Sequence, residues 1–127
     1  MTPADAIGAL GKVLTNEAIL ANSTRIGNDL ADMKALDPFN DALFARRVVA
    51  LTADILRAKA APKTHGKALE HHLAGWRRSK FPPHPEDDFR LIFRATSDGR
   101  LELLGFGHRT DPVPVYLGAK ARAKSSR

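Results

Sequence analysis

The first sixty residues carry apolar side chains at every third or fourth position, the spacing of amphipathic helices. In residues 1–36 this stripe consists of Ile7, Leu10, Leu14, Ile26, Leu30, Met33 and Leu36. Thr2 followed by Pro3 is typical of a helix start. Gly27 and the polar run at 22–24 are places where the helical region can break in two. We therefore predict an N-terminal helical region over residues 1–36.

Asp37-Pro38 is the clearest helix-start signal in the chain, because Asp can cap a helix and Pro suits its first position. An apolar face then continues for about six turns, through Phe39, Leu43, Val48, Leu51 and Ile55. Pro62 limits the end of this segment. The spacing predicts one long helix over 38–60, and its aliphatic stripe is interpreted as core packing.

After Pro62 the apolar period falls to two, which is typical of strands. We predict three strands, over Trp76–Phe81, Phe89–Thr96 and Arg100–His108. Asp98-Gly99 between the last two indicates a tight hairpin. Helices followed by an antiparallel sheet give an α+β class, with N-terminal helices packed on a small antiparallel sheet. The predicted organisation is a single domain over 1–117 with its sheet in 76–109, followed by a basic C-terminal tail over 118–127.

Composition narrows the class of protein. The chain has 127 residues, 43% of them apolar, so it can bury one modest core. It has no cysteine, which fits a reducing compartment. No apolar run approaches the length of a membrane span, about 20 residues, and the N-terminus does not resemble a signal peptide. We therefore expect a cytoplasmic protein without a membrane partner.

The net charge of +6 lies entirely in the C-terminal half. Residues 1–62 hold seven basic and seven acidic residues, whereas residues 63–127 hold thirteen basic and seven acidic residues. Such asymmetry favours a polyanionic partner, either a nucleic acid or an acidic protein. A solvated surface that only aids solubility is the alternative.

Alternation along the strands sorts these charges by face. Phe89, Leu91, Phe93 and Ala95 share one face, which we expect under the helices. Arg90, Ile92 and Arg94 share the other face. In the last strand Gly105, Gly107 and Arg109 are expected opposite Leu104 and Phe106. If the cationic faces coincide, one open side of the sheet carries Arg78, Lys80, Arg90, Arg94 and Arg109. That surface would suit a phosphodiester backbone, and edge-blunting charges on a solvated face are the alternative.

Four segments of the C-terminal half resemble the RelE/ParE toxin superfamily. They are Leu73-Ala74-Gly75-Trp76-Arg77-Arg78-Ser79-Lys80, Phe89-Arg90-Leu91-Ile92-Phe93-Arg94, Leu104-Gly105-Phe106-Gly107-His108-Arg109 and Val115-Tyr116. Members commonly have a basic strand after leucine-x-glycine, then tyrosine-arginine-leucine-isoleucine-tyrosine-arginine, then glycine-histidine-arginine. The match covers roughly 55 residues.

The resemblance implies the toxin of a type II toxin–antitoxin pair. In the RelE branch the activity is metal-independent cleavage of messenger RNA on the ribosome, which inhibits translation. Carried over by motif, the catalytic residues are Lys80, Arg90, Arg109 and Tyr116, and the RNA-binding residues are Arg78, Lys80 and Arg94. The implied partners are a cognate antitoxin protein and mRNA on the ribosome.

Two departures from the family pattern bear on the fold. The proline-rich loop after Phe81 is longer than usual in the family. The segment between Arg109 and Tyr116 is longer than the family pattern by one residue. The family also opens with a strand that joins the sheet, whereas this chain opens with helix. Lys12–Thr15 is a candidate for a short strand; otherwise the sheet lacks an edge or an added helix covers it.

In such a reaction the ribose 2′-hydroxyl attacks the adjacent phosphate, and the bond from phosphorus to the 5′-oxygen breaks, which leaves a cyclic phosphate and a free 5′-hydroxyl. Arg90 and Arg109 suit stabilisation of the phosphorane charge, and Lys80 or Tyr116 could serve as the base. His108 has a suitable intrinsic pKa. Because it is adjacent to Arg109, a regular strand points it to the other face, and we interpret it as structural.

No cofactor or metal is predicted. His65, His71, His72 and Glu70 match no standard zinc spacing. Trp76, at the start of a strand, is interpreted as core. Two alternative functions remain open: a non-catalytic ParE-like DNA gyrase poison, and an inactive RelE-fold module that binds nucleic acid or protein.

Overall fold

Capping side chains define where the N-terminal helices begin. The computed structural model describes residues 1–81, 89–109 and 114–125. Helix α1 (Pro3–Leu14) starts with a capping box between Thr2 and Asp5. Helix α2 (Ser23–Leu36) is capped by Asn22, and α3 (Asp41–Ala60) by Asn40. The helical interpretation of the N-terminal half is therefore confirmed.

The predicted start of the long helix at Pro38 is wrong by three residues. Asp37 does not cap α3, because its carboxylate accepts a hydrogen bond from the Arg47 guanidinium instead. The side chain of Asn40 accepts from the backbone N–H of Leu43 at 3.1 Å and sets the first turn of α3.

The opening strand lies later than Lys12–Thr15, which belongs to the last turn and cap of α1. Strand β1 is only Ile19–Leu20, between α1 and α2. It pairs in parallel with the start of the last strand, at Leu101 and Glu102. The sheet therefore does gain an edge strand from the N-terminal half.

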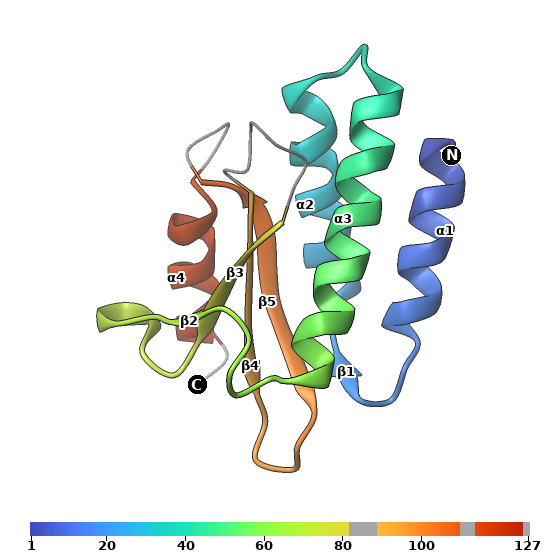
Figure 1. Cartoon of the computed structure of the whole chain (residues 1–127). Coiled ribbons are helices and arrows are strands. Elements are labelled where there is room, and N and C mark those ends of the chain that lie inside the picture. Colours follow the sequence, from blue (N-terminus) through green and yellow to red (C-terminus); the bar gives the residue numbers. More distant parts are fainter. Residues whose placement is uncertain (82–88, 110–113, 126–127) are drawn as a thin grey trace.

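The remaining strands are β2 (Lys67–Ala68), β3 (Arg77–Phe81), β4 (Phe89–Ala95) and β5 (Leu101–His108), with a 3-10 turn η1 (His71–Leu73) between β2 and β3. Their order in the sheet is β1-β5-β4-β3-β2 (Figure 1). The strands β3 to β5 are antiparallel as predicted. Strand β2, which was not predicted, is also antiparallel, and β1 makes the whole sheet mixed. The α+β class is confirmed.

A β-bulge interrupts the pairing of β4 with β5. Ile92 pairs with Gly105 and Phe93 pairs with Leu103, so Leu104 is an extra residue in β5. The bulge turns Leu104 to the face opposite Phe106. The predicted grouping of Leu104 with Phe106 is therefore wrong, because regular alternation does not hold across a bulge.

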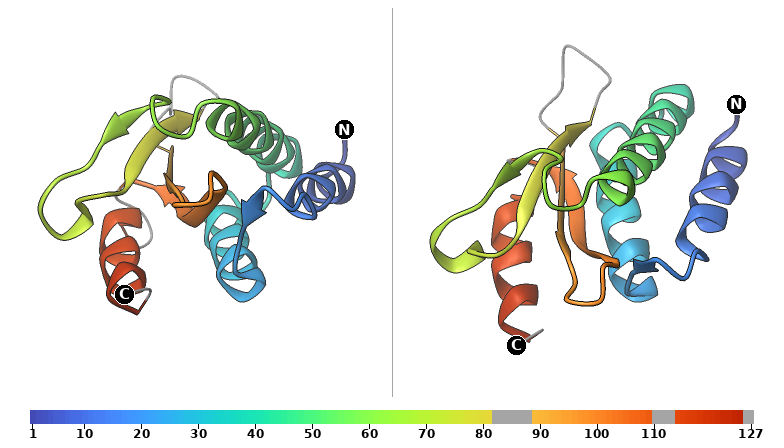
Figure 2. Two further views of the ribbon diagram at one scale, coloured as in Figure 1. Left: turned by 90° about the horizontal axis from the view of Figure 1, so that it is seen from below. Right: turned by 60° about the horizontal axis from the view of Figure 1, so that its bottom comes forward.

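Two apolar clusters cover the two faces of the sheet. The helical core joins α1, α2 and α3 to large strand residues that include Phe81, Phe89, Leu91, Phe93 and Phe106. The α4 core lies on the other face and consists of Leu73, Trp76, Ile92, Leu104, Val115, Ala119 and Ala123. Figure 2 shows α3 and α4 (Val115–Ser125) on opposite sides of the strands.

The predicted basic tail over 118–127 is wrong for its described part, because residues 115–125 form α4. Ala119 and Ala123 are buried against the sheet. As a result, the sheet face that was expected to be open is partly covered by a helix. Within the described ranges, no helix is long and apolar enough to cross a membrane.

Candidate functional site

The register of β3, β4 and β5 places three of the predicted cations on one face. Lys80 pairs with Arg90, which pairs with Gly107. In the next row Arg78 pairs with Ile92, which pairs with Gly105. Directly paired residues share a face, and Ile92 belongs to the α4 core. The predicted convergence of Arg78, Lys80 and Arg90 thus occurs on the α4 side of the sheet.

These three cations differ in their access to solvent. Lys80 is exposed and Arg78 is half-buried. Arg90 is 5% exposed, and its Nη1 donates to the carbonyl of Phe89 at 3.2 Å. Arg90 was expected on an open face, but it is buried. Lys80 is therefore the accessible member of the row that it shares with Arg90.

Arg94 is held by two neighbours on the same face. Its Nε donates to Glu102 Oε1 at 2.7 Å, and its guanidinium lies 4.1 Å from the centre of the Trp76 ring. Such cation–π contacts stabilise structure. Trp76 is 4% exposed, which confirms that it is a core residue. The Arg94 side chain is accordingly engaged in packing, although it keeps about a third of its surface in solvent.

Arg109 and Tyr116 complete the predicted set. Arg109 is exposed immediately after β5. Tyr116 is half-buried at the start of α4 and packs against the α4 core. Residues 82–88 and 110–113, which contain the two segments whose lengths depart from the family pattern, lie outside the described residues.

His108 faces away from these cations, as predicted. Its ring meets the edge of the Phe89 ring at a centroid distance of 5.3 Å and an angle of 89°. Phe89 belongs to the helical core, on the opposite side of the sheet from Lys80 and Arg90. His108 therefore does not share a face with Arg90.

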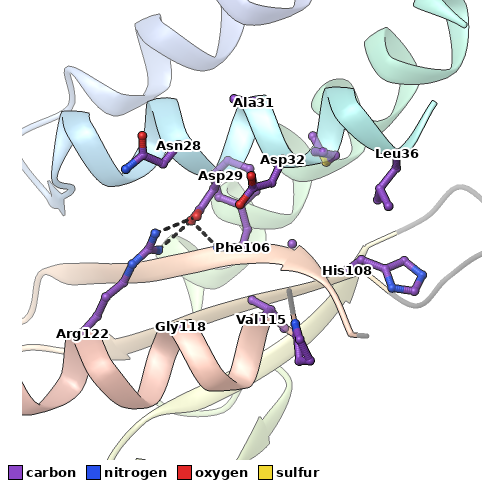
Figure 3. Close-up of a pocket in the computed structure, with 13 residues that line it drawn as sticks. Asn28, Asp29, Ala31, Asp32, Leu36, Phe106, His108, Val115, Gly118 and Arg122 are labelled. Carbon is purple, nitrogen blue, oxygen red and sulfur yellow. Dashed lines mark hydrogen bonds and ion pairs between the residues drawn. The ribbon is translucent and has the colours of Figure 1, made fainter. Parts of the chain in front are cut away.

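A cavity of about 420 Å³ lies between α2, the end of β5 and α4 (Figure 3). Its polar lining includes Asn28, Asp29, Asp32, His108 and Arg122, and its apolar lining includes Met33, Leu36, Phe106 and Val115. Sequence reasoning missed this site. It borders the α4 core at Val115, which belongs to both.

An ion pair between Asp29 and Arg122 closes one end of this cavity. Arg122 Nη1 and Nη2 each lie 2.8 Å from a separate oxygen of the Asp29 carboxylate. The backbone N–H of Phe106 donates to the same carboxylate at 3.0 Å, and Arg122 Nη1 also donates to the carbonyl of Leu104 at 3.1 Å. The hydrogen bond from Arg122 to Asp29 is the main cause that raises the pKa of Arg122, and the charge of Asp32 adds to it.

One signal could have revealed Asp29. It lies three residues after Ile26 and four before Met33, and all three are buried. An acid inside the apolar stripe of a helix is unusual, because burial of a charge is costly unless it is paired. Its partner Arg122 lies in the predicted tail and carries no comparable signal.

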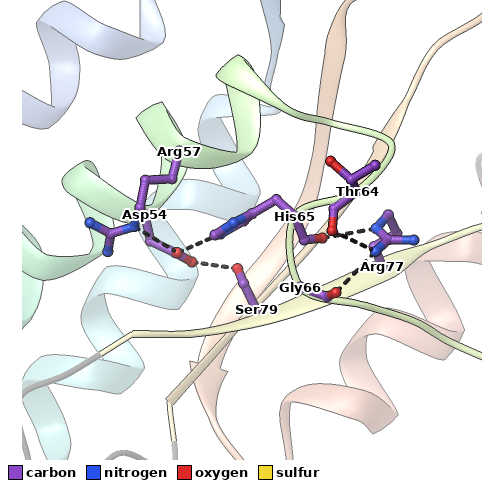
Figure 4. Close-up of polar contacts among 7 residues, drawn as sticks. All are labelled: Asp54, Arg57, Thr64, His65, Gly66, Arg77 and Ser79. Carbon is purple, nitrogen blue, oxygen red and sulfur yellow. Dashed lines mark hydrogen bonds and ion pairs between the residues drawn. The ribbon is translucent and has the colours of Figure 1, made fainter.

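A second buried acid, Asp54 of α3, lies on the helical side of the sheet (Figure 4). His65 Nε2 lies 2.8 Å from Asp54 Oδ1, and the Ser79 hydroxyl donates to Asp54 Oδ2. These are the residue types of a hydrolase triad, but the serine bonds to the acid rather than to the histidine. Ser79 is also buried. The arrangement therefore offers no activated nucleophile.

Arg77 fixes the loop that carries His65. Its guanidinium donates to the backbone carbonyls of Thr64, His65 and Gly66 at 3.1, 2.8 and 3.0 Å. Together with Asp54, this arginine ties residues 64–66 to α3 and β3. Among the described residues, no group of three His, Cys, Asp or Glu side chains could hold a metal ion.

Comparison with known proteins does not assign this chain to a protein family. The chain matches no protein-family model, and no curated protein matches it. The function is therefore inferred from the residues and their geometry.

Proposed function

We propose that this protein is the toxin of a type II toxin–antitoxin pair and that it cleaves messenger RNA on the ribosome without a metal ion. The observation that carries the proposal is the register that aligns Lys80 with Arg90 and places Arg78 one row away on the same face. The motif resemblance adds the reaction class. The strand β1, which precedes α2 and α3 and joins the sheet beside β5, fits the family's opening strand.

The chemistry follows from the residue types on this face. Cross-strand neighbours such as Lys80 and Arg90 have Cβ atoms about 5 Å apart, so both can approach one phosphodiester group. Guanidinium groups grip phosphate with paired donors, which suits Arg90 and Arg109 for the charge that develops on the phosphorane. Lys80 or Tyr116 takes the proton of the 2′-hydroxyl as its oxygen attacks phosphorus, and the 5′-oxygen leaves and takes up a proton from solvent.

Access distinguishes the roles of these cations. Lys80 and Arg109 are exposed and meet RNA first. Arg90 is buried, so it is not a first contact for RNA. The proposed partner is an antitoxin with an acidic segment that covers Lys80 and Arg109, and the proposed compartment is the cytoplasm, where the ribosome is.

A ParE-like poison of DNA gyrase is the second candidate. The burial of Arg90 and the packing of Tyr116 against the α4 core favour it, because they withdraw two proposed catalytic groups from solvent. The exposed cations would then serve binding alone.

Induced expression in bacteria, followed by primer extension on cellular transcripts, tests the proposal. We expect growth arrest with new 5′ ends inside coding regions within minutes. The variants Lys80→Ala and Arg109→Ala should restore growth and remove these ends, because they delete exposed cations at little cost in stability. Arg46→Ala is the matched control, since Arg46 is exposed on α3, away from this face.

The outcomes separate the two candidates. Intact transcripts together with an induced DNA-damage response would support the gyrase poison. Cleavage that persists unchanged in both Lys80→Ala and Arg109→Ala would contradict the assignment of the site to this face.

A further inference from the structure

We infer that the Asp29–Arg122 ion pair is a positioning device: it holds α4 on the sheet and thereby fixes Tyr116 relative to the Lys80–Arg90 row. The catalytic consequence rests on the proposed function. The mechanical part concerns α4 alone and can be tested separately.

The ion pair joins three elements at one point. Asp29 comes from α2, Arg122 from α4, and both bond to the backbone of β5 at Phe106 and Leu104. Strand β1 pairs with β5 at Leu101 and Glu102, before this point. Asp29 and Arg122 thus supply hydrogen bonds to β5 beyond the end of β1. A paired guanidinium and carboxylate fix direction as well as distance, because two parallel bonds set the orientation of both groups.

The apolar packing of α4 provides little orientation by itself. Its buried side chains are Val115, Ala119 and Ala123, two of which are single methyl groups. Methyl groups make few contacts that would resist rotation or sliding of a helix. Arg122 is therefore the long side chain of α4 that bonds to the backbone of β5 and fixes the position of the helix along the strand.

The ion pair lies directly against Gly105, at a place where a side chain would not fit. A Cβ atom at position 105 would lie 2.4 Å from Arg122 Nη1 and 3.1 Å from Asp29 Oδ2. The first distance is far below van der Waals contact, so any side chain there would displace the guanidinium. Gly105, directly after the bulged residue Leu104, therefore leaves the space that the ion pair occupies.

Tyr116 moves with α4. It lies six residues before Arg122, about 9 Å along the helix, and it packs against the core that contains Trp76. Displacement of α4 therefore changes both the place of the Tyr116 hydroxyl and the surroundings of Trp76. Asp29 does not touch the proposed reacting groups, and its role is to position them.

The test uses Trp76, the single tryptophan of the chain, as a reporter. Two variants disturb the ion pair in different ways: Asp29→Asn removes the charge, and Gly105→Ala removes the space. Gly118→Ala is the matched control, because a Cβ there meets no atom within 4 Å. Each purified protein is assayed for Trp76 emission, for acrylamide quenching, and for ribosome-dependent mRNA cleavage, with far-UV circular dichroism to verify the fold.

We expect both variants to shift Trp76 emission to longer wavelength and to increase its quenching. Cleavage should show kcat reduced about tenfold or more with KM nearly unchanged, because misplaced catalytic groups slow the chemical step. Arg122→Lys, which keeps the charge but loses the paired geometry, should fall between parent and Asp29→Asn. Gly118→Ala should behave as the parent.

Parental emission, quenching and kcat in both Asp29→Asn and Gly105→Ala would overturn the inference. If the parent itself cleaves no RNA but Trp76 still responds to both variants, the nuclease proposal fails while the anchoring of α4 by Asp29 stands. A response of Gly118→Ala equal to that of the two variants would also overturn it, since α4 would then be sensitive to any change.

Discussion

The two faces of the sheet are stabilised in different ways. The face under α1, α2 and α3 buries three phenylalanines of β3 and β4 with aliphatic side chains from all three helices. The face under α4 buries a smaller cluster, in which Val115 and two alanines are the buried residues of α4; the cluster consists of Leu73, Trp76, Ile92, Leu104, Val115, Ala119 and Ala123. Hydrophobic stabilisation scales with the apolar area removed from water, so the first face contributes more. The difference indicates that the helical face supplies stability, whereas the α4 face can be opened at lower cost.

The buried acid beside each face repeats this contrast. Asp54 bonds to the Ser79 hydroxyl and the His65 ring within the helical side, and Arg57 lies 3.8 Å from it at the surface. Asp29 bonds to a guanidinium of another helix and to a strand N–H. The hydrogen bonds of Asp54 attach the loop that carries His65 to the helical core. The ion pair of Asp29, in contrast, holds α4, a helix that would otherwise be weakly fixed.

The largest expected effect comes from two matched leucines. Leu91 on the helical face and Leu104 on the α4 face are both fully buried. Leu91→Ala should lower the free energy of unfolding by about 4 kcal/mol, near the upper end for such changes, and Leu104→Ala by about 2.5 kcal/mol. Chemical denaturation measures both. A larger loss for Leu104→Ala than for Leu91→Ala would contradict the comparison of the two faces.

Next in size is Asp29→Asn, which should cost about 2 kcal/mol. The substitution leaves a partly buried guanidinium at Arg122 without its carboxylate, a costly state in a protein interior. The cost is moderated because the Arg122 side chain keeps 21% of its surface exposed. Urea denaturation measures the difference in unfolding free energy between the parent and Asp29→Asn. Added salt should leave this difference nearly unchanged, since a buried ion pair is weakly screened.

A smaller loss, about 1 kcal/mol, is expected for Asp54→Asn. An amide at position 54 can still accept from Ser79 and can donate to the His65 ring, so both partners remain bonded. Asp54→Leu, which offers neither group, is the informative companion and should cost clearly more. Equal losses for Asp54→Asn and Asp54→Leu would show that hydrogen bonding at this acid contributes nothing.

The smallest effect is expected in the β4–β5 turn, which belongs to neither face. Hydrogen bonds from Thr96 and then Arg100 lower the pKa of Asp98 below its ordinary value. A lowered pKa means that the ionised form stabilises the folded protein. The advantage over Asp98→Asn should be complete at neutral pH and should disappear as the pH falls below about 3.9, the ordinary value for aspartate. Thermal melts of both proteins across this range measure it.

Local patterns predicted most of the fold. Cap residues, helical stripes and the Asp98-Gly99 turn act within a few residues, so α3 and β3 to β5 were found within a few residues of their ends. The helical region over 1–36 was also found, but the boundary between α1 and α2 was not fixed. Strand β1 was misplaced because two residues carry no periodic signal. Helix α4 was missed because its buried side chains are mostly alanines among basic residues, and its apolar stripe is therefore weak.

The candidate site was predicted in part. Strand alternation correctly put Arg78, Lys80 and Arg90 on one face, because the period of two holds on β3 and β4. The burial of Arg90 was not predictable, since strand alternation assigns a side chain to a face but does not tell whether that face is open. Leu104 was misplaced by a bulge, and Asp29 was not recognised because its partners lie 77 and 93 residues further along the chain.

The late partners of Asp29 have a consequence during synthesis. The ribosome makes α1, β1, α2 and α3 long before β5, yet Asp29 and Ile19 acquire their strand neighbours only when residues 101–106 emerge. Arg122, the other partner of Asp29, follows sixteen residues after Phe106. Contacts of such high sequence separation slow folding. A nascent chain that stalls before residue 101 therefore carries an unpaired acid and an unclosed sheet edge, and it should be a preferred substrate for chaperones and proteases.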